Sequence, residues 1–157
     1  MDMGGFGMDW KIVGTGSANL TWAVGEELLE LRTTYVGDGL QSLLQAALDL
    51  RIGSSATLAW LPTEPGAHVF VFGGAAEEVN VQILFLRDEY AKDPWQGARR
   101  RWVGRIRVDA FTAATAKMAQ TVLEQHGEVG YRRAWGDIPF PSQQLTLLQQ
   151  AITSSSN

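Results

Sequence analysis

The sequence of 157 residues contains no cysteine. Disulfide bonds, thiolate metal ligands and cysteine nucleophiles are therefore excluded. The sequence also lacks any apolar run close to the ~20 residues that a membrane-spanning helix needs. Its first ten residues, MDMGGFGMDW, include an acidic residue and lack the apolar core of a secretory signal. These absences lead us to expect a cytoplasmic protein that does not enter a membrane.

Basic residues are too few for a dedicated nucleic-acid-binding protein. The chain has 13 lysines and arginines against 17 aspartates and glutamates, so its formal net charge is −4. Nucleic-acid-binding domains usually have a basic balance or a basic stripe. The composition therefore argues against nucleic acid as a partner, and only a local basic stripe would support it.

Apolar residues are abundant enough for one core. Hydrophobic residues make up 45% of the chain, and its length is that of a single domain. A chain of this size buries roughly 70% of its unfolded surface when it folds. We find no internal repeat or linker, so we expect one domain over residues 10–152. A flexible segment at 1–9 would precede it, and a disordered tail at 153–157 would follow.

Alternating apolar and polar residues predict most of the strands. A tight turn at Gly25 and Glu26 separates two alternating segments, which together predict a hairpin. Residues 10–13 are compatible with one short additional strand. The expected strands are 19–24, 27–36, 55–62, 68–74, 78–86 and 100–109.

Three segments change to helical periodicity. The first helix is expected to be capped by Asp38 and stopped by Gly53, the second to run from a cap at Asp109 to Gly127, and the third to be capped by Ser142. The predicted order is therefore β-β-α-β-β-β-β-α-α. Short links between consecutive strands favour antiparallel pairing. We expect an α+β domain, with an antiparallel meander sheet of about five to six strands covered on one face by two main helices.

The segment 92–109, KDPWQGARRRWVGRIRVD, holds five of the ten arginines and two tryptophans. Strand periodicity places Trp102 toward the core and Arg101, Arg105 and Arg107 on the opposite, solvent-facing side. This separation bears on function, because nucleic-acid binding needs basic residues interleaved with exposed aromatic ones.

Three interpretations of this segment remain open. In the first, the arginines pair with Asp88, Glu89 and Asp93 of the preceding segment and form a salt-bridged outer face. In the second, the segment binds nucleic acid, but Trp95 alone would be placed to stack on bases. In the third, it binds a protein, because loops that carry Arg, Trp and Tyr often form interfaces. The candidate partner-binding residues are Tyr90, Trp95, Arg99, Arg100 and Arg101.

The remaining polar motifs do not indicate catalysis. His68 and His126 are far apart in the sequence and match no metal-binding spacing. Residues 14–19, GTGSAN, lack phosphate-loop spacing and lead into a strand. We therefore assign no catalytic, cofactor-binding or metal-binding residue and expect no cofactor.

Residues 131–141, YRRAWGDIPFP, concentrate aromatic residues and prolines. One interpretation is a lid whose aromatic side chains hold the last helix against the end of the sheet. The other is a rigid aromatic recognition loop.

The segments TYVGDGLQSLLQAAL and LEQHGEVGYRRAWGDIPFP, with the meander between them, resemble small bacterial proteins of unknown function. The resemblance spans most of residues 10–150. In size, acidity and class, the chain also resembles the immunity proteins of bacterial toxin systems. The shared motifs are packing and turn motifs, so the resemblance carries over no catalytic residue.

Our leading hypothesis is a non-enzymatic protein-binding domain that uses the segment from Tyr90 to Arg101 and the adjacent sheet face. One version is an immunity-type inhibitor of a basic toxin, attracted by electrostatic steering. That version would also use a set of acidic residues, Glu26, Glu27, Glu30, Glu77 and Glu78.

Two alternatives belong to other classes. The first is a small-molecule-binding or enzymatic domain whose pocket lies between sheet and helices and is lined by Trp22, Trp60 and Tyr35. The second is a homo-oligomer in which the exposed sheet face is a subunit interface. Self-association therefore stands beside a separate protein partner as an expectation.

Overall fold

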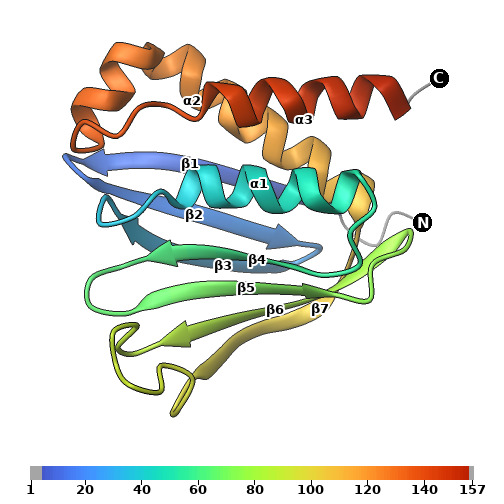
Figure 1. Cartoon of the computed structure of the whole chain (residues 1–157), viewed down its shortest axis with the longest axis horizontal. Coiled ribbons are helices and arrows are strands. Elements are labelled where there is room, and N and C mark those ends of the chain that lie inside the picture. Colours follow the sequence, from blue (N-terminus) through green and yellow to red (C-terminus); the bar gives the residue numbers. More distant parts are fainter. Residues whose placement is uncertain (1–4, 156–157) are drawn as a thin grey trace.

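The computed structural model describes residues 5–155 and contains seven strands and three helices in that range. Figure 1 shows their arrangement. The strands are β1 Phe6–Gly14, β2 Ser17–Val24, β3 Glu27–Thr34, β4 Thr57–Pro62, β5 Ala67–Gly73, β6 Glu78–Leu86 and β7 Arg99–Arg107. The helices are α1 Gly39–Arg51, α2 Val108–Ala134 and α3 Ser142–Ser155. None of these helices is both long enough and apolar enough to span a bilayer.

The α+β class and the antiparallel pairing are confirmed, but the strands form two sheets. One sheet has the order β1-β2-β3 and the other has the order β4-β5-β6-β7. The expectation of a single sheet of five to six strands with two main helices therefore agrees only roughly with the observed two sheets and three helices. The chain leaves β3 through α1 before it returns as β4, so the hairpin pairing that propagates a meander is interrupted there.

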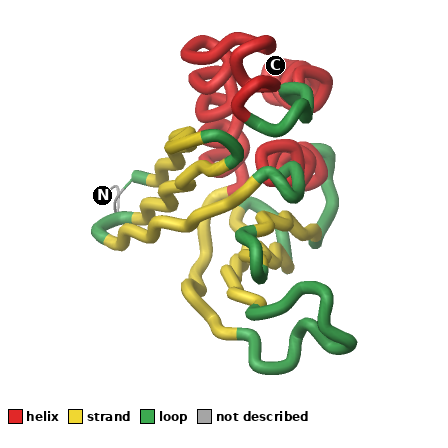
Figure 2. The backbone as a smooth tube through the Cα atoms, turned by 90° about the vertical axis from the view of Figure 1, so that its left-hand side faces the viewer, coloured by secondary structure: helices red, strands yellow, loops and turns green. Residues whose placement is uncertain are grey.

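The helices lie together at one side of the molecule. In Figure 1, α1 lies in front of β1 and β2, while α2 and α3 lie above them. Figure 2 shows the same separation from the side, with the loop between β6 and β7 at the end opposite α2 and α3. This arrangement keeps that loop and the neighbouring part of the second sheet away from the helices.

Both ends of the described chain are more regular than we expected. Strand β1 begins at Phe6 and pairs with β2 from Phe6 and Val24 onward, so residues 6–9 of the expected flexible segment form a strand. Helix α3 reaches Ser155, so residues 153–155 of the expected tail are helical. Residues 1–4 and 156–157 lie outside the described residues.

Helix α1 confirms the predicted capping. The Asp38 carboxylate accepts a hydrogen bond from the backbone N–H of Gln41 at 3.0 Å. Burial raises the pKa of this carboxyl, although the same hydrogen bond acts in the opposite direction. The helix ends at Arg51, and Gly53 follows with a φ of 109°, as expected of a glycine stop signal.

Helix α2 differs from its prediction at both ends. It begins at Val108, so Asp109 lies in the first turn instead of capping it. Gly127 has a φ of 68° and a ψ of 169°, which kinks the helix, yet helical structure resumes and continues to Ala134. Gly127 therefore interrupts the helix where a stop was predicted, but the seven residues that follow form a further helical segment that was not predicted. Ser142 is the first residue of α3, and its hydroxyl donates to Glu128 at 2.7 Å.

Trp22 of β2 lies at the centre of the core and is fully buried. Its ring packs edge-on against Phe70 of β5 at 5.3 Å and Trp102 of β7 at 5.4 Å between centroids. It also contacts Phe6 of β1 and Phe111 of α2. One side chain therefore joins the two sheets and the long helix.

The segment 131–141 is a lid, and its aromatic residues face inward. Tyr131 and Trp135 are fully buried and Phe140 is 4% exposed. Trp135 packs against Trp10 of β1 with ring centroids 5.7 Å apart. The alternative of an aromatic recognition loop is therefore wrong for these three side chains, which pack the end of α2 against β1 and the residues before α3 against α2.

Tyr35 lies between two glycines from distant turns. A Cβ atom at Gly16 would approach the Tyr35 ring to 2.5 Å, and one at Gly136 would approach it to 2.3 Å. Both glycines have positive φ, 73° and 63°. The backbone N–H of Gly16 also donates to the carbonyl of Ala134 at 2.6 Å. The ring thus packs the β1–β2 turn against the end of α2.

We predict that Gly136→Ala and Gly16→Ala each lower the free energy of unfolding by about 1–3 kcal/mol. An alanine at either position combines an unfavourable φ with a clash against the Tyr35 ring. Gly97→Ala is the matched control, because Gly97 also has a positive φ, 76°, and a Cβ there meets no atom within 4 Å. Urea unfolding followed by far-ultraviolet circular dichroism measures the change. Equal effects at Gly97 and Gly136 would contradict the role of the Tyr35 contact.

We also predict that Trp102→Ala lowers the free energy of unfolding by about 3–5 kcal/mol, as large core truncations do. Trp102 is 9% exposed, packs against Trp22 and donates from Nε1 to Glu27 at 3.3 Å. Trp95→Ala is the comparison. We expect it to lower the free energy of unfolding by no more than about 1 kcal/mol, because Trp95 is half exposed and makes only an edge contact. Chemical unfolding of both variants tests the assignment of one tryptophan to the core and the other to the surface.

Candidate functional site

The loop at 87–98 joins β6 to β7 and is held by its own acidic residues. The carboxylates of Asp88 and Asp93 accept hydrogen bonds from the backbone N–H groups of Tyr90 at 3.0 Å and Trp95 at 3.2 Å. The Glu89 carboxylate accepts from the backbone N–H of Gly66 at 3.0 Å. The expected pairing of these acids with the arginine row is therefore wrong. Short side chains next to free backbone amides bind those amides first.

The two aromatic residues of the loop are accessible. Tyr90 is 81% exposed and Trp95 is 45% exposed. The Trp95 ring packs edge-on against Trp60 of β4, with centroids 6.3 Å apart. The loop therefore folds back over β4, which is two strands from β6 and three from β7 in the order of the second sheet.

Strand register shows which side chains share the outer face of the second sheet. Residues directly opposite each other on antiparallel strands point to the same face. One cross-strand row is Leu58, Val71, Gln82 and Val103, and the neighbouring row is Trp60, Val69, Leu84 and Arg100.

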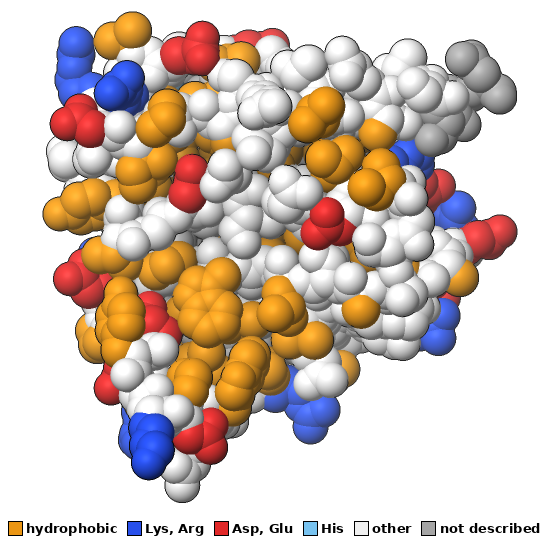
Figure 3. All heavy atoms as spheres, viewed as in Figure 1, with side chains coloured by type: hydrophobic (Ala, Val, Ile, Leu, Met, Phe, Trp, Pro, Cys, Tyr) orange, Lys and Arg blue, Asp and Glu red, His pale blue; other side chains and the backbone are white. Residues whose placement is uncertain are grey.

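These two rows produce an apolar surface, which we call the outer patch. Leu58 and Val103, at the two ends of the first row, are 50% and 54% exposed. Trp60, Val71 and Leu84 are half-buried. Figure 3 shows hydrophobic side chains gathered over the part of the surface where β4, β5 and β6 lie. The outer patch consists of Leu58, Trp60, Val71, Leu84, Trp95 and Val103.

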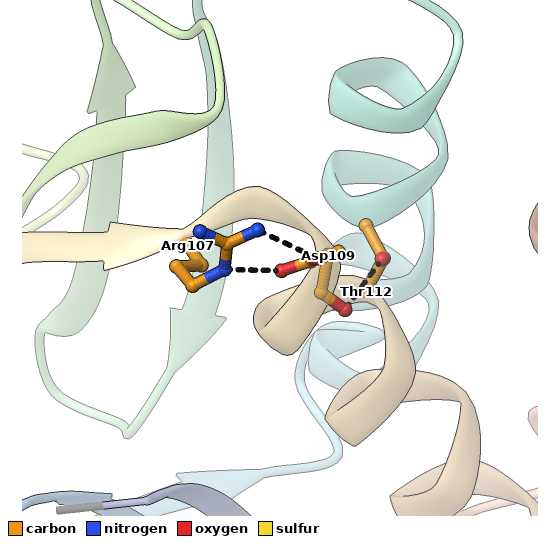
Figure 4. A network of polar contacts seen from close by, with 3 residues as sticks. All are labelled: Arg107, Asp109 and Thr112. Atoms are coloured by element: carbon orange, nitrogen blue, oxygen red, sulfur yellow. Dashed lines mark hydrogen bonds and ion pairs between the residues drawn. The ribbon is translucent and has the colours of Figure 1, made fainter. Parts of the chain in front are cut away.

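The arginine row lies beside the outer patch, on the solvent-facing side of β7 that its alternation predicted. Arg105 pairs with Glu78 at 3.2 Å. Arg107 donates two hydrogen bonds of 3.0 Å to the Asp109 carboxylate, as Figure 4 shows. The hydrogen bond from Arg107 lowers the pKa of Asp109. The acidic partners of this row therefore come from the start of β6 and the first turn of α2.

Arg101 is directed differently because β7 changes register next to it. The pairing passes from Ile83 with Trp102 to Leu84 with Arg100 and skips Arg101. The Arg101 guanidinium lies 3.3 Å from Nε2 of His68, a residue that is 5% exposed. Burial and the charge of Arg101 lower the pKa of His68 to about 4, against a smaller opposing effect of the Arg32 backbone. His68 is thus neutral at pH 7.

The five candidate partner-binding residues lie near one end of the second sheet. Tyr90 and Trp95 belong to the loop, and the three arginines are the first residues of β7. The guanidinium of Arg99 lies over the Phe85 ring at 5.7 Å, and Arg100 continues the row that contains Trp60. The aliphatic members of the outer patch were not among the residues predicted from the sequence. Their signal was the near-continuous apolar runs LAWLP and HVFVF, which indicate strands with apolar residues on both faces.

The pocket expected from Trp22, Trp60 and Tyr35 is absent. Trp22 is fully buried in the core, Trp60 lies on the outer face of the second sheet, and Tyr35 is 50% exposed between two turns. The three belong to β2, β4 and the β3–α1 connection, and they face different neighbours. The core positions between them are filled by side chains such as Leu20 and Phe70.

A different hollow lies between β1 and α2. Its volume is about 460 Å³, and its lining includes Phe6, Met8, Ala114 and Met118, with Asp9 and Lys117. A more polar hollow of about 350 Å³ lies beside the start of α2 and includes Arg51 and Arg107. Among residues 5–155, no group of three or more His, Cys, Asp or Glu side chains is placed to hold a metal ion.

No protein-family model matches the chain, and neither does any curated protein or solved structure with which it was compared.

We predict that His68 makes the protein less stable as the pH falls from 6.5 toward 4. The unfolded chain takes up a proton near the ordinary pKa of 6.5, whereas the folded protein resists protonation until about 4. The stabilising contribution is complete above pH 6.5 and is lost through this window, with a size on the order of 2 kcal/mol. His68→Phe keeps the aromatic contact with Phe85 and removes the titration. Urea unfolding at pH 7 and pH 4.5 should show a smaller decrease for the variant than for the wild type. The same decrease in both would contradict the assignment to His68.

Proposed function

We propose that this chain is a non-enzymatic protein-binding domain that docks a protein partner on the outer patch and on the adjoining loop residue Tyr90. The observation that carries the proposal is the set of accessible apolar side chains on two neighbouring cross-strand rows. Leu58, Val71 and Val103 belong to the first row, in which Gln82 lies between Val71 and Val103, and Trp60 and Leu84 belong to the second. Contiguous apolar surface on a folded domain often marks an interaction site, because burying it against a partner releases water.

The composition of the outer patch supports this reading. The outer patch combines aliphatic side chains with the Trp60–Trp95 pair, has the polar Gln82 between Val71 and Val103, and has Arg100 at the end of one row. Aromatic residues and arginine are enriched among the side chains that contribute most to protein interfaces. An inhibitor that occludes its partner, as immunity proteins do, is one version of such a function.

We predict that Leu58→Glu combined with Val103→Glu abolishes partner binding and leaves the fold intact. Both positions are about half exposed, so the substitutions place charge on the docking surface without entering the core. Leu147→Glu on α3, where the leucine is 41% exposed, is the matched control. Circular dichroism verifies that all three proteins fold alike.

Affinity capture from the cells that naturally express the protein, followed by mass spectrometry, is the measurement. A protein that wild type and Leu147→Glu retain, and that the double variant loses, supports the proposal. Retention of the same partner by the double variant would show that the outer patch is not the docking surface.

The hollow between β1 and α2 supports a second candidate, a small-molecule-binding domain. Its volume of about 460 Å³ and its apolar lining with Asp9 and Lys117 are compatible with a small amphipathic ligand. Ala114→Phe would fill the hollow. A compound that raises the melting temperature of the wild type and not of this variant would support the second candidate.

A further inference from the structure

The first residues of β7 carry positive charge that lacks an acidic partner. Five of the nine residues of β7 are arginines, and all five are exposed. Within residues 5–155, only Arg105 and Arg107 of these five take part in ion pairs. Arg99 lies over the Phe85 ring, and Arg101 lies against the neutral His68. Three guanidinium groups at this end of the strand therefore lack a paired carboxylate. Of the three, only Arg100 is in register with a residue of the outer patch, because Arg99 and Arg101 lie against Phe85 and His68 on the other face.

The nearest acidic residues in the chain are already used by the loop. The carboxylates of Asp88, Glu89 and Asp93 accept hydrogen bonds from backbone N–H groups. These contacts define the shape of the loop and direct carboxylate oxygens toward the backbone. Within residues 5–155 none of them forms an ion pair with Arg100, so this guanidinium can still form a direct contact with a carboxylate from outside the chain.

Arg100 connects this charge to the apolar surface. It pairs in register with Leu84, so it continues the cross-strand row that contains Trp60 and Val69. A partner that covers the aliphatic and aromatic members of the outer patch therefore reaches Arg100 at the end of the same row. An arginine at the border of an apolar patch binds a carboxylate in a geometry with two parallel hydrogen bonds.

Most of the glutamates that were expected to attract a basic partner lie in the first sheet. Glu26, Glu27 and Glu30 belong to the β2–β3 turn and to β3 in the first sheet, and Glu27 already accepts a hydrogen bond from Trp102. Glu78 is paired with Arg105. The expectation that the chain attracts a basic partner through its glutamates therefore concerns another part of the surface than the outer patch.

Resting on the proposed function, we propose that the segment docked on the outer patch is acidic: its apolar side chains cover the row from Leu58 to Val103, and a carboxylate faces Arg100 at the end of the neighbouring row. Charge complementarity then selects the partner, and the apolar contact supplies most of the affinity. A basic segment would bring like charges together at the end of β7.

Charged residues on an edge strand also hinder pairing with other sheets. β7 is an edge strand of the second sheet, so this role applies to its arginines in any case. A purely protective role predicts changes in aggregation after substitution and no preference between acidic and basic ligands. The two roles therefore differ in a measurable way.

The test uses two synthetic amphipathic peptides with the same leucine face, one with glutamate and the other with lysine at every polar position. Each is titrated into the full-length protein labelled for nuclear magnetic resonance. We expect the glutamate peptide to bind roughly tenfold or more tightly than the lysine peptide at low salt, and this difference to shrink as salt is raised. Shifts should concentrate at Leu58, Val71, Val103 and Arg100.

Arg100→Glu should abolish or reverse the preference for the glutamate peptide. Arg133→Glu, which changes an exposed arginine on α2, is the matched control and should leave the preference unchanged. Selective binding that depends on Arg100 supports the proposal. Equal binding of both peptides at the outer patch would overturn the acidic preference and leave the docking surface in place.

Shifts that fall outside the outer patch, or a preference for the lysine peptide, would also overturn the proposal. If neither peptide binds, the proposal that the outer patch docks an acidic amphipathic segment is wrong. The capture experiment with Leu58→Glu and Val103→Glu then decides separately whether the outer patch docks a protein. The two proposals therefore fail on different measurements.

Discussion

The ring of Trp22 is the contact on which the arrangement of the two sheets depends. It extends from β2 into the space between the sheets and meets Phe70, Trp102 and Phe111, which belong to β5, β7 and α2. Its Nε1 is buried without a hydrogen-bond partner in the described residues, a cost of about 1–3 kcal/mol. The aromatic packing around a fully buried indole offsets that cost, because burial of a large aromatic side chain is among the strongest single contributions to a core.

This inward packing determines what the opposite face of the second sheet can do. Once Trp102 points to Trp22, strand alternation places Val103 and Arg105 on the other face of β7. The same alternation turns Phe70 inward and Val71 outward on β5. The position of the outer patch therefore follows from how the core is filled. The patch is apolar because these strands carry apolar residues at outward-facing as well as inward-facing positions.

Electrostatic properties of the whole chain and of its parts differ. The net charge is negative, yet half of the arginines lie in one strand beside the outer patch. Over more than about 10 Å, salt weakens the effect of distant carboxylates, so a bound segment responds mainly to the charges next to it. The acidic residues of the neighbouring loop form no ion pair with the arginines at the start of β7 in the described residues, because their carboxylates bind backbone N–H groups, although they keep their negative charge. Net charge alone is thus a poor guide to the partner of this surface.

Local patterns in the sequence determined most elements and the direction of their side chains. The tight turn at Gly25, the cap at Asp38 and the inward phase of Trp102 follow from interactions between residues close in the chain, which the sequence displays directly. Candidate residues such as Trp95 were also visible as exposed loop residues. Only the tertiary structure decided that the strands divide into two sheets, that Tyr35 lies between Gly16 and Gly136, and that Trp60 meets Trp95. These features depend on contacts between segments far apart in the sequence, and periodicity in one segment carries no information about which other segment will pack against it.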